Sequence, residues 1–289
     1  MTIREKGYFH WDGTLRERRL AWWPVTRLGI RLAFKKKGFK FLYFGAFIPA
    51  LVFLVGIYIS ERIGEFRYMI RGSSQLVEVN PAFFKTYFTS DFLLFMMVML
   101  MVVGGAGLIA DDLRSNALQL YFSRPLEKRD YLAGKASVLI FFLLTLTLAP
   151  GLVFIVFKLL FSGSFRFVAA YPWLLLSIPA YSAVVTLFFC LYTLFLSSLS
   201  RNRRYVSILL FAVYFVSDIL FGIFYGNFKS PAFALISLKA NLQQVGAFLF
   251  KQKPPYEVSV AWSALVLAAV CLAAYLYLDK KVRSVEVVK

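Results

Sequence analysis

Residues 104–135 read GGAGLIADDLRSNALQLYFSRPLEKRDYLAGK, and this stretch organises the rest of the chain. An uncharged apolar run ends at Asp111, and another begins after Lys135. The charged residues between the two runs are costly to place in hydrocarbon. We therefore interpret the runs as membrane-spanning helices and residues 111–135 as a hairpin that leaves the membrane between them.

The composition extends this interpretation to the whole chain. The 289 residues are 60% hydrophobic, whereas soluble domains hold about 45–50% apolar residues. The apolar residues form runs long enough to cross a hydrocarbon core of about 30 Å as helices. These runs lie at 41–60, 92–110, 136–157, 172–199, 205–228 and 258–278. A spanning segment must satisfy its own backbone hydrogen bonds, so we predict an all-α integral membrane protein. Its six transmembrane helices would form a single transmembrane domain over residues 1–289.

The net charge of +18 would suggest a nucleic-acid partner for a soluble protein. Here the Lys and Arg residues gather in the loops that flank the apolar runs, so we expect no nucleic-acid partner. Segments 1–40, 111–135, 200–204 and 279–289 hold 23 of these residues, against 10 in the similarly long loops 61–91, 158–171 and 229–257. Positive residues favour the cytoplasmic side. We therefore expect both termini and the hairpin to be cytoplasmic.

Two segments outside the apolar runs have helical periodicity. In residues 22–38, Arg27, Arg31 and Lys35 share one face beside an apolar face, which is typical of a helix lying in the membrane interface. The alternative is a solvated basic arm. In the last outer loop, apolar residues recur at spacings of three and four after Pro231. That helix would either dip into the membrane surface or cap the bundle.

The hairpin itself has signals for a short helix. We expect Asp112 to cap a helix over 113–121, because an acidic residue suits a helix start. One face of that helix would carry Leu113, Ala117, Leu120 and Tyr121. The Arg124-Pro125 pair would end it, because proline disfavours helical geometry in the preceding residue. The result is either a lever braced across two spanning helices or an ordinary charged loop.

Several residues inside the apolar runs stand out. Asp218 lies well inside the fifth run, where a charge costs about 2.5–3.5 kcal/mol. It is either a carboxylate of a transport pathway or a buried structural contact, for instance to Ser217, Tyr214 or another helix. The glycines of 104–107 predict close helix packing. Pro150-Gly151 and Pro179 predict bends in the third and fourth helices.

The sequence gives little support for metal binding, a disulfide or nucleotide binding. His10 is the only histidine, and Cys190 and Cys271 lie in apolar runs, so we expect no metal site and no disulfide. Residues 133–136 read AGKA, which lacks the earlier glycine and the Ser/Thr of a phosphate-binding loop. We therefore expect no cofactor and no catalytic site in this chain.

The hairpin resembles the cytoplasmic segment of ABC exporter permeases of the type-2 class. That pattern is an acidic residue, Gly-Thr-Leu, a short apolar run, Arg-Pro-Leu, a basic residue and Gly-Lys. The matching residues here are Asp112, 116–118, 120–122, 123–126, Arg129 and 134–135. Asp112 replaces the usual Glu and Asn116-Ala117 replaces Gly-Thr, so the motif does not assign the chain to a subfamily.

The resemblance implies a function that the residues alone do not name. It implies that Asp112, Leu113, Ala117, Leu120, Tyr121, Arg124 and Pro125 belong to a coupling helix that docks on a separate ATPase. ATP and Mg would then be bound by that partner. It also implies a second permease copy or a homologous permease, a bacterial cytoplasmic (inner) membrane, membrane lipid around the bundle, and export as the direction. The alternatives are an ion-coupled carrier or channel, which would need more intramembrane charges, and a membrane-embedded enzyme.

Overall fold

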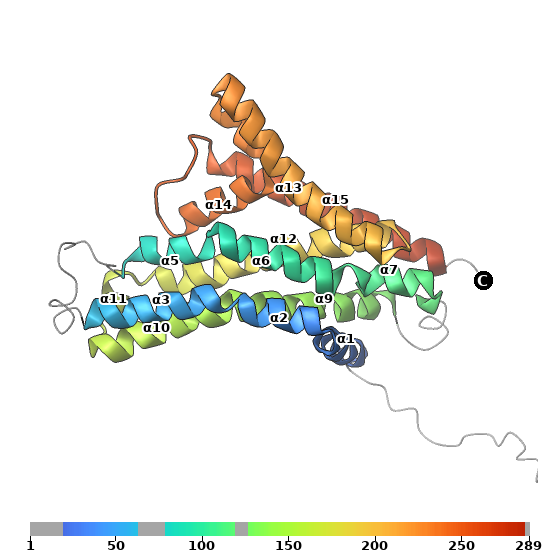
Figure 1. The fold of residues 1–289 in the computed structure, drawn as a ribbon, viewed down its shortest axis with the longest axis horizontal. Coiled ribbons are helices and arrows are strands. Elements are labelled where there is room, and N and C mark those ends of the chain that lie inside the picture. The colour runs from blue at the N-terminus through green and yellow to red at the C-terminus, as the bar shows by residue number, and fades with distance from the viewer. Residues whose placement is uncertain (1–19, 63–78, 119–126, 287–289) are drawn as a thin grey trace, which may run out of the picture.

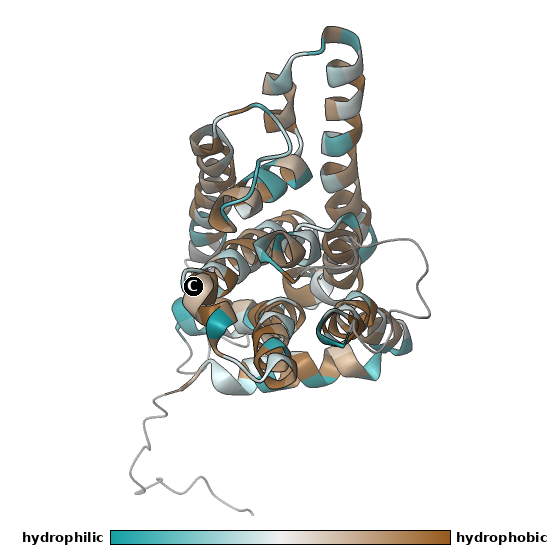
Figure 2. Ribbon diagram, turned by 90° about the vertical axis from the view of Figure 1, so that its left-hand side faces the viewer, coloured by the Kyte–Doolittle hydropathy of each residue, from teal (hydrophilic) through white to brown (hydrophobic). Residues whose placement is uncertain are grey.

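The computed structural model describes residues 20–62, 79–118 and 127–286, and every regular element in these ranges is a helix. Within these described ranges, six segments are long and apolar enough to cross a membrane. They are Lys37–Glu61, Pro81–Arg114, Lys128–Ser162, Leu174–Leu199, Arg203–Phe228 and Val260–Lys281. Each overlaps one predicted run, so the all-α fold with six spanning helices is confirmed. Figure 2 shows that apolar residues predominate along these helices and reach the outer faces of the bundle.

Three of the six spanning segments consist of more than one helix. The first contains α2 (Lys37–Gly45) and α3 (Ile48–Glu61), and the third contains α9 (Lys128–Leu146) and α10 (Leu148–Ser162). The second contains α5 (Pro81–Phe88), α6 (Asp91–Leu100), a π-helical turn (Met101–Gly105) and α7 (Gly107–Arg114). The last three segments are α12 (Leu174–Leu199), α13 (Arg203–Phe228) and α15 (Val260–Glu286), each an uninterrupted helix.

Side-chain caps decide where several of these helices begin. Asn80 accepts the Phe83 N–H at the start of α5, and Ser90 accepts the Leu93 N–H at the start of α6. Asn202 does the same for the Arg204 N–H at the start of α13. Each satisfies a backbone donor that the first turn of a helix leaves free. At the other end, Gly163 ends α10 in the left-handed conformation (φ 58°).

Helix α12 lies at the centre of the bundle, where it packs against α7, α9, α13, α14 and α15. Buried side chains occur along its whole length, from Leu174 to Ser198. The helix continues through Pro179 without interruption, so proline causes no break there. The predicted bend near Pro150 is present. Between α9 and α10 the backbone departs from helical geometry at Thr147 (φ −113°, ψ −69°).

Figure 1 shows two distinct ends of the bundle. The end of α7, the start of α9, the helix α1 (Trp23–Lys35) and the end of α15 lie together, and we call this the hairpin end. Helix α5 and the short helix α11 (Arg166–Ala170) lie at the opposite end. Helix α13 starts at the hairpin end and then diverges from the other spanning helices (Figure 1).

The two helices predicted outside the spans are present, with corrected bounds. Helix α1 ends at Lys35, short of the predicted residue 38, because Lys36 is extended (ψ 117°) and redirects the chain into α2. After the 3-10 turn Pro231–Ile236, helix α14 (Leu238–Leu249) buries Leu238, Leu242 and Val245. It packs against α12, α13 and α15.

Candidate functional site

The hairpin differs from its prediction at its first residues. Helix α7 runs through Asp112 and ends at Arg114, so Asp112 lies in the last turn of a helix and does not cap a new one. The reason is that the backbone N–H groups at this point still bond within α7, as the Ser115 N–H does to the Asp111 carbonyl. Asn116 then adopts the left-handed conformation (φ 52°), which asparagine tolerates.

The remaining predicted hairpin residues divide into two groups. Leu113 and Ala117 are half-buried beside the end of α7. Leu120, Tyr121, Arg124 and Pro125 lie outside the described residues, and so do residues 119–121 of the predicted helix 113–121.

The Asp112 carboxylate joins the two helices that bound the hairpin. Its Oδ2 lies 2.7 Å from Lys135 Nζ and accepts a 2.8 Å hydrogen bond from the Tyr131 hydroxyl, both on α9. The Lys135 and Asp112 side chains are only 11% and 15% exposed. An ion pair this shielded from water is screened less than a surface pair, and removing one partner leaves a poorly solvated charge. We call Asp112, Tyr131 and Lys135 the clasp.

Helix α1 packs on the same two turns of α9. The Thr26 hydroxyl bonds to the Gly134 carbonyl at 3.1 Å, one residue before Lys135. A Cβ at Gly134 would lie 2.7 Å from the Val25 side chain, so only glycine allows this approach. In Figure 1, α1 is seen nearly end-on while the spanning helices lie across the view. Helix α1 therefore crosses the base of the bundle at the clasp.

Just before the clasp, polar side chains of α13 donate hydrogen bonds to backbone carbonyls of the second spanning segment. In the π-helical turn, the Ala106 N–H bonds to the Met101 carbonyl, which leaves the Val102 carbonyl without its usual helical donor. Ser207 on α13 donates to that carbonyl at 3.3 Å. Arg203 on α13 donates to the next carbonyl, that of Val103, at 2.7 Å.

Ser197 on α12 inserts into the same helix one turn later. Its hydroxyl accepts the N–H groups of Ile109 and Ala110 at 3.0 and 3.1 Å and donates to the Ala106 carbonyl at 2.8 Å. A side chain inserted into the helical ladder is a recognised cause of a bend. The segment that leads into the hairpin is therefore shaped by contacts from α12 and α13.

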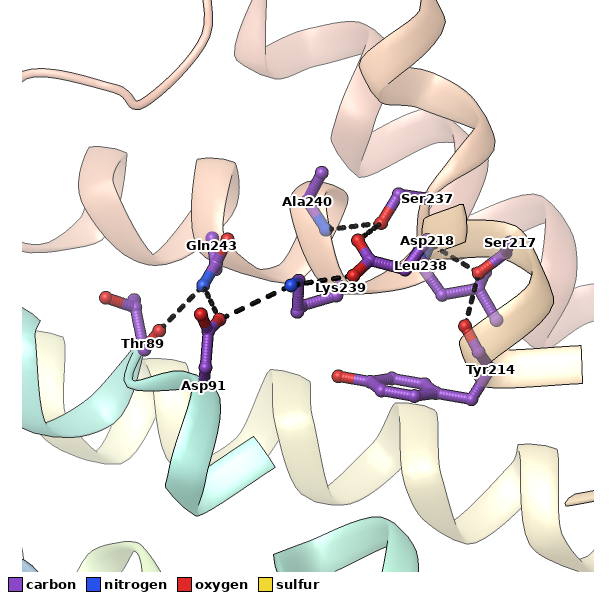
Figure 3. Close-up of polar contacts among 10 residues, drawn as sticks. All are labelled: Thr89, Asp91, Tyr214, Ser217, Asp218, Ser237, Leu238, Lys239, Ala240 and Gln243. Atoms are coloured by element: carbon purple, nitrogen blue, oxygen red, sulfur yellow. Dashed lines mark hydrogen bonds and ion pairs between the residues drawn. The ribbon is translucent and has the colours of Figure 1, made fainter. Parts of the chain in front are cut away.

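Asp218 lies in a second polar network, away from the hairpin end. Its carboxylate accepts a 2.9 Å hydrogen bond from Ser237 and lies 2.7 Å from Lys239 Nζ (Figure 3). Ser237 also caps α14 by accepting the Ala240 N–H at 3.1 Å. Asp218 thus connects α13 to the first turn of α14.

The same network continues to the second spanning segment. Lys239 Nζ lies 3.6 Å from Asp91, whose carboxylate also accepts a 2.9 Å bond from Gln243 (Figure 3). Asp91, Asp218 and Lys239 line an open groove of about 370 Å³, together with Phe92, Phe95, Tyr214 and Phe215. Burial lowers the pKa of Lys239, but its hydrogen bond to Asp218 and the nearby carboxylates raise the pKa further, so the net shift is upward. Lys239 is therefore held in its charged form.

A sequence profile of the ABC-2 family transporter proteins matches residues 39–278, which is most of the chain. This chain belongs to the ABC-2 transporter family. A comparison with curated proteins found no match. Members of this family are membrane permeases of ABC transporters, so the chain is a transport subunit and is not itself the catalytic one. The family as a class associates with ABC ATPase subunits.

Several polar residues of the permease's two networks escaped the sequence analysis. Lys239 could have been found, because it is the one cation between Lys229 and Lys251 and falls on the predicted outer helix. An isolated Asp218 in a spanning helix calls for such a cation. The roles of Ser197, Arg203 and Ser207 could not be predicted from the sequence, because their partners are backbone carbonyls and N–H groups that no sequence pattern marks.

Proposed function

We propose that this permease is driven by a separate ATPase subunit, which docks on the hairpin 111–135 and binds the ATP and Mg. The hairpin end and both termini are then cytoplasmic, and the transporter works as an exporter in a bacterial cytoplasmic membrane. The charge distribution supports this orientation, and the likeness of the hairpin residues to type-2 exporter permeases supports this direction.

The clasp is the observation that carries the proposal. Asp112 at the end of α7 is tied to Tyr131 and Lys135 in the first turns of α9. A push on the hairpin therefore moves the second and third spanning segments together and does not splay them apart. Helix α1 bears on the same turns of α9 through Thr26. We propose that α1 lies in the membrane interface, since it exposes both Leu28 and Arg31.

A second permease copy or a homologous permease completes the pathway in this proposal. Helix α13 diverges from the other spanning helices (Figure 1), and it exposes apolar side chains in its second half. Val216, Ile219 and Ile223 are 48%, 59% and 53% exposed. Membrane lipid or a second copy can cover such a face, and the second copy would bring two such helices together.

The docking role is tested with Leu120→Arg, a substitution on the face predicted to meet the ATPase. The permease is purified with its candidate ATPase, and co-purification and permease-stimulated ATP hydrolysis are measured. We expect Leu120→Arg to abolish both. The matched control is Phe165→Arg, which places the same charge at an exposed apolar residue near α11, at the opposite end. Normal association of Leu120→Arg with the ATPase would refute docking at the hairpin.

The same preparation separates the remaining function classes. An ion-coupled carrier or channel would move its cargo in vesicles without any ATPase, whereas the proposed exporter requires both the ATPase and ATP. A membrane-embedded enzyme would turn over a substrate with the permease alone. Transport that persists without the ATPase would favour the carrier.

We propose that Asp218 contributes to the transport pathway through the groove that it lines with Asp91 and Lys239. The structural alternative is that its pair with Lys239 only fastens α14. Asp218→Asn is compared with Ser237→Ala, which removes another contact between α13 and α14 but keeps the carboxylate. A pathway role predicts lost transport in Asp218→Asn alone. Equal transport by both variants across pH would leave only the structural role.

A further inference from the structure

A hollow at the hairpin end has no role in the function proposed above. It lies between the end of α7 and the start of α13, has a volume of about 680 Å³ and is open to the surroundings. Its lining residues are Asp111, Arg114, Arg201, Asn202, Arg203 and Arg204. Four guanidinium groups thus face one carboxylate around a single hollow.

Most of these cations are available to a ligand. Within the described part of the chain, Arg114, Arg201 and Arg204 form no ion pair, and all three are exposed. Only Arg203 is committed, through its bond to the Val103 carbonyl. The pKa of the nearby Lys36 is lowered overall. Burial and the positive charge of Arg203 lower this pKa, while Asp111 raises it. The hollow is therefore a region of positive potential with unused hydrogen-bond donors.

Exposed apolar side chains lie close to these arginines along the chain. Tyr205 and Ile208, in the first two turns of α13, are 66% and 65% exposed, and Leu199 at the end of α12 is 40% exposed. A spanning helix presents such side chains to hydrocarbon. The cations therefore lie where a lipid's headgroup meets its acyl chains. A soluble anion has no apolar part that could pack against these side chains, whereas a lipid has acyl chains.

We propose that this hollow binds the phosphate-bearing headgroup of an anionic phospholipid, with Arg201, Arg204 and Arg114 as its ligands. The planar guanidinium donates two parallel hydrogen bonds to phosphate oxygens, which an ammonium cannot do. The first turn of the 26-residue helix α13 adds the positive end of its dipole. The acyl chains lie along Tyr205 and Ile208.

The position of this site gives the lipid a structural consequence. Arg203 and Ser207, next to the headgroup site, hold the Val103 and Val102 carbonyls of the π-helical turn. Arg114 belongs to the last turn of α7, two residues after the clasp residue Asp112. A headgroup held between Arg114 and Arg201 therefore fixes the end of α7 against the start of α13.

The test measures lipid binding by the full chain in detergent. Native mass spectrometry and thermal unfolding are followed as phosphatidylglycerol, phosphatidylcholine or inorganic phosphate is added. We expect phosphatidylglycerol alone to be retained and to raise the Tm. Arg201→Gln/Arg204→Gln should weaken its binding by about tenfold or more, since two charge-assisted hydrogen-bonding groups are lost. Arg201→Lys/Arg204→Lys, which keeps the charge, should fall between that variant and the wild type.

The control is Arg129→Gln/Lys280→Gln, which removes two exposed cations at the same end of the bundle. It should retain the wild-type affinity for phosphatidylglycerol. Equal loss in this control, equal binding of phosphatidylcholine, or an equal effect of inorganic phosphate would each overturn the proposal. So would unchanged lipid binding by Arg201→Gln/Arg204→Gln with loss of ATPase or of a second permease copy, because the hollow would then be a protein interface.

Discussion

The Tyr87 hydroxyl donates a 2.9 Å hydrogen bond to the buried carbonyl of Leu146. That carbonyl precedes Pro150 by four residues, and proline has no N–H with which to complete the helical bond. Tyr87 on α5 therefore supplies the donor that the third spanning segment lacks where α9 gives way to α10. The bend is a stable feature because its free carbonyl has a fixed partner.

Tyr87→Phe should lower the free energy of unfolding by about 1–3 kcal/mol, because it leaves a buried carbonyl without a donor. Thermal or denaturant unfolding in detergent measures this loss. In a Pro150→Ala background the new N–H can reach Leu146, so the same substitution should cost less. Tyr275→Phe, at a 56% exposed tyrosine on α15, serves as the control and should have little effect. An equal cost of Tyr87→Phe in both backgrounds would contradict this assignment.

Under the proposed coupling to an ATPase subunit, the clasp predicts a variant that still binds the ATPase but no longer stimulates it. Lys135→Met leaves the Asp112 carboxylate with the Tyr131 hydroxyl as its remaining clasp partner, in a site only 15% exposed. We expect a loss of about 1–3 kcal/mol of stability, with ATPase co-purification retained and stimulated ATP hydrolysis reduced. Lys280→Met, at an exposed lysine, is the control. Wild-type stimulation by Lys135→Met would remove the clasp from the coupling mechanism.

The spanning helices could be predicted from sequence because hydrocarbon imposes a length and a composition on each of them. The six runs, helix α14 and the bend near Pro150 all follow from local patterns. The position of α7 could not be predicted. Asp112 has the residue type of a helix start, yet it is used as a tertiary ion-pair partner for Lys135 in a helix end.

The polar networks were less accessible to sequence reasoning than the helices. A contact from Asp218 to another helix was one of the expected alternatives and is present, but its partners at the start of α14, Ser237 and Lys239, were not named from the sequence. The π-helical turn depends on donors from Ser207 and Arg203, which lie about a hundred residues away in sequence. Pairings across that separation are set by how whole helices pack, and no local spacing encodes them.

Gly105 predicts a tightly packed crossing of the second and fourth spanning segments. A Cβ at Gly105 would lie 2.5 Å from the Thr193 Cγ2 methyl on α12. Gly105→Ala should therefore destabilise the protein by about 1–3 kcal/mol through overpacking. Thr193→Ser removes that methyl and should restore part of the loss, as measured by Tm. Gly222→Ala, where a Cβ meets nothing within 4 Å, is the control. No rescue by Thr193→Ser would show that the clash lies elsewhere.

The ion pair between Lys239 and Asp218 predicts a specific dependence of stability on pH. The pKa of Lys239 is raised above its usual 10.5 in the folded protein. A group with a raised folded pKa contributes stability fully below its unfolded pKa, and the contribution is lost as pH rises through the folded pKa.

Lys239→Met should therefore lose the same stability, about 1–3 kcal/mol, at every pH between about 6 and 9. The difference from the wild type should shrink only above pH 10.5. The free energy of unfolding of the variant and of the wild type, measured at each pH, gives this difference. Asp91→Asn is the control, because Asp91 is 72% exposed and lies 3.6 Å from Lys239, so its contribution should be small. A difference that already changes between pH 6 and 9 would mean that Lys239 does not carry its charge throughout that range.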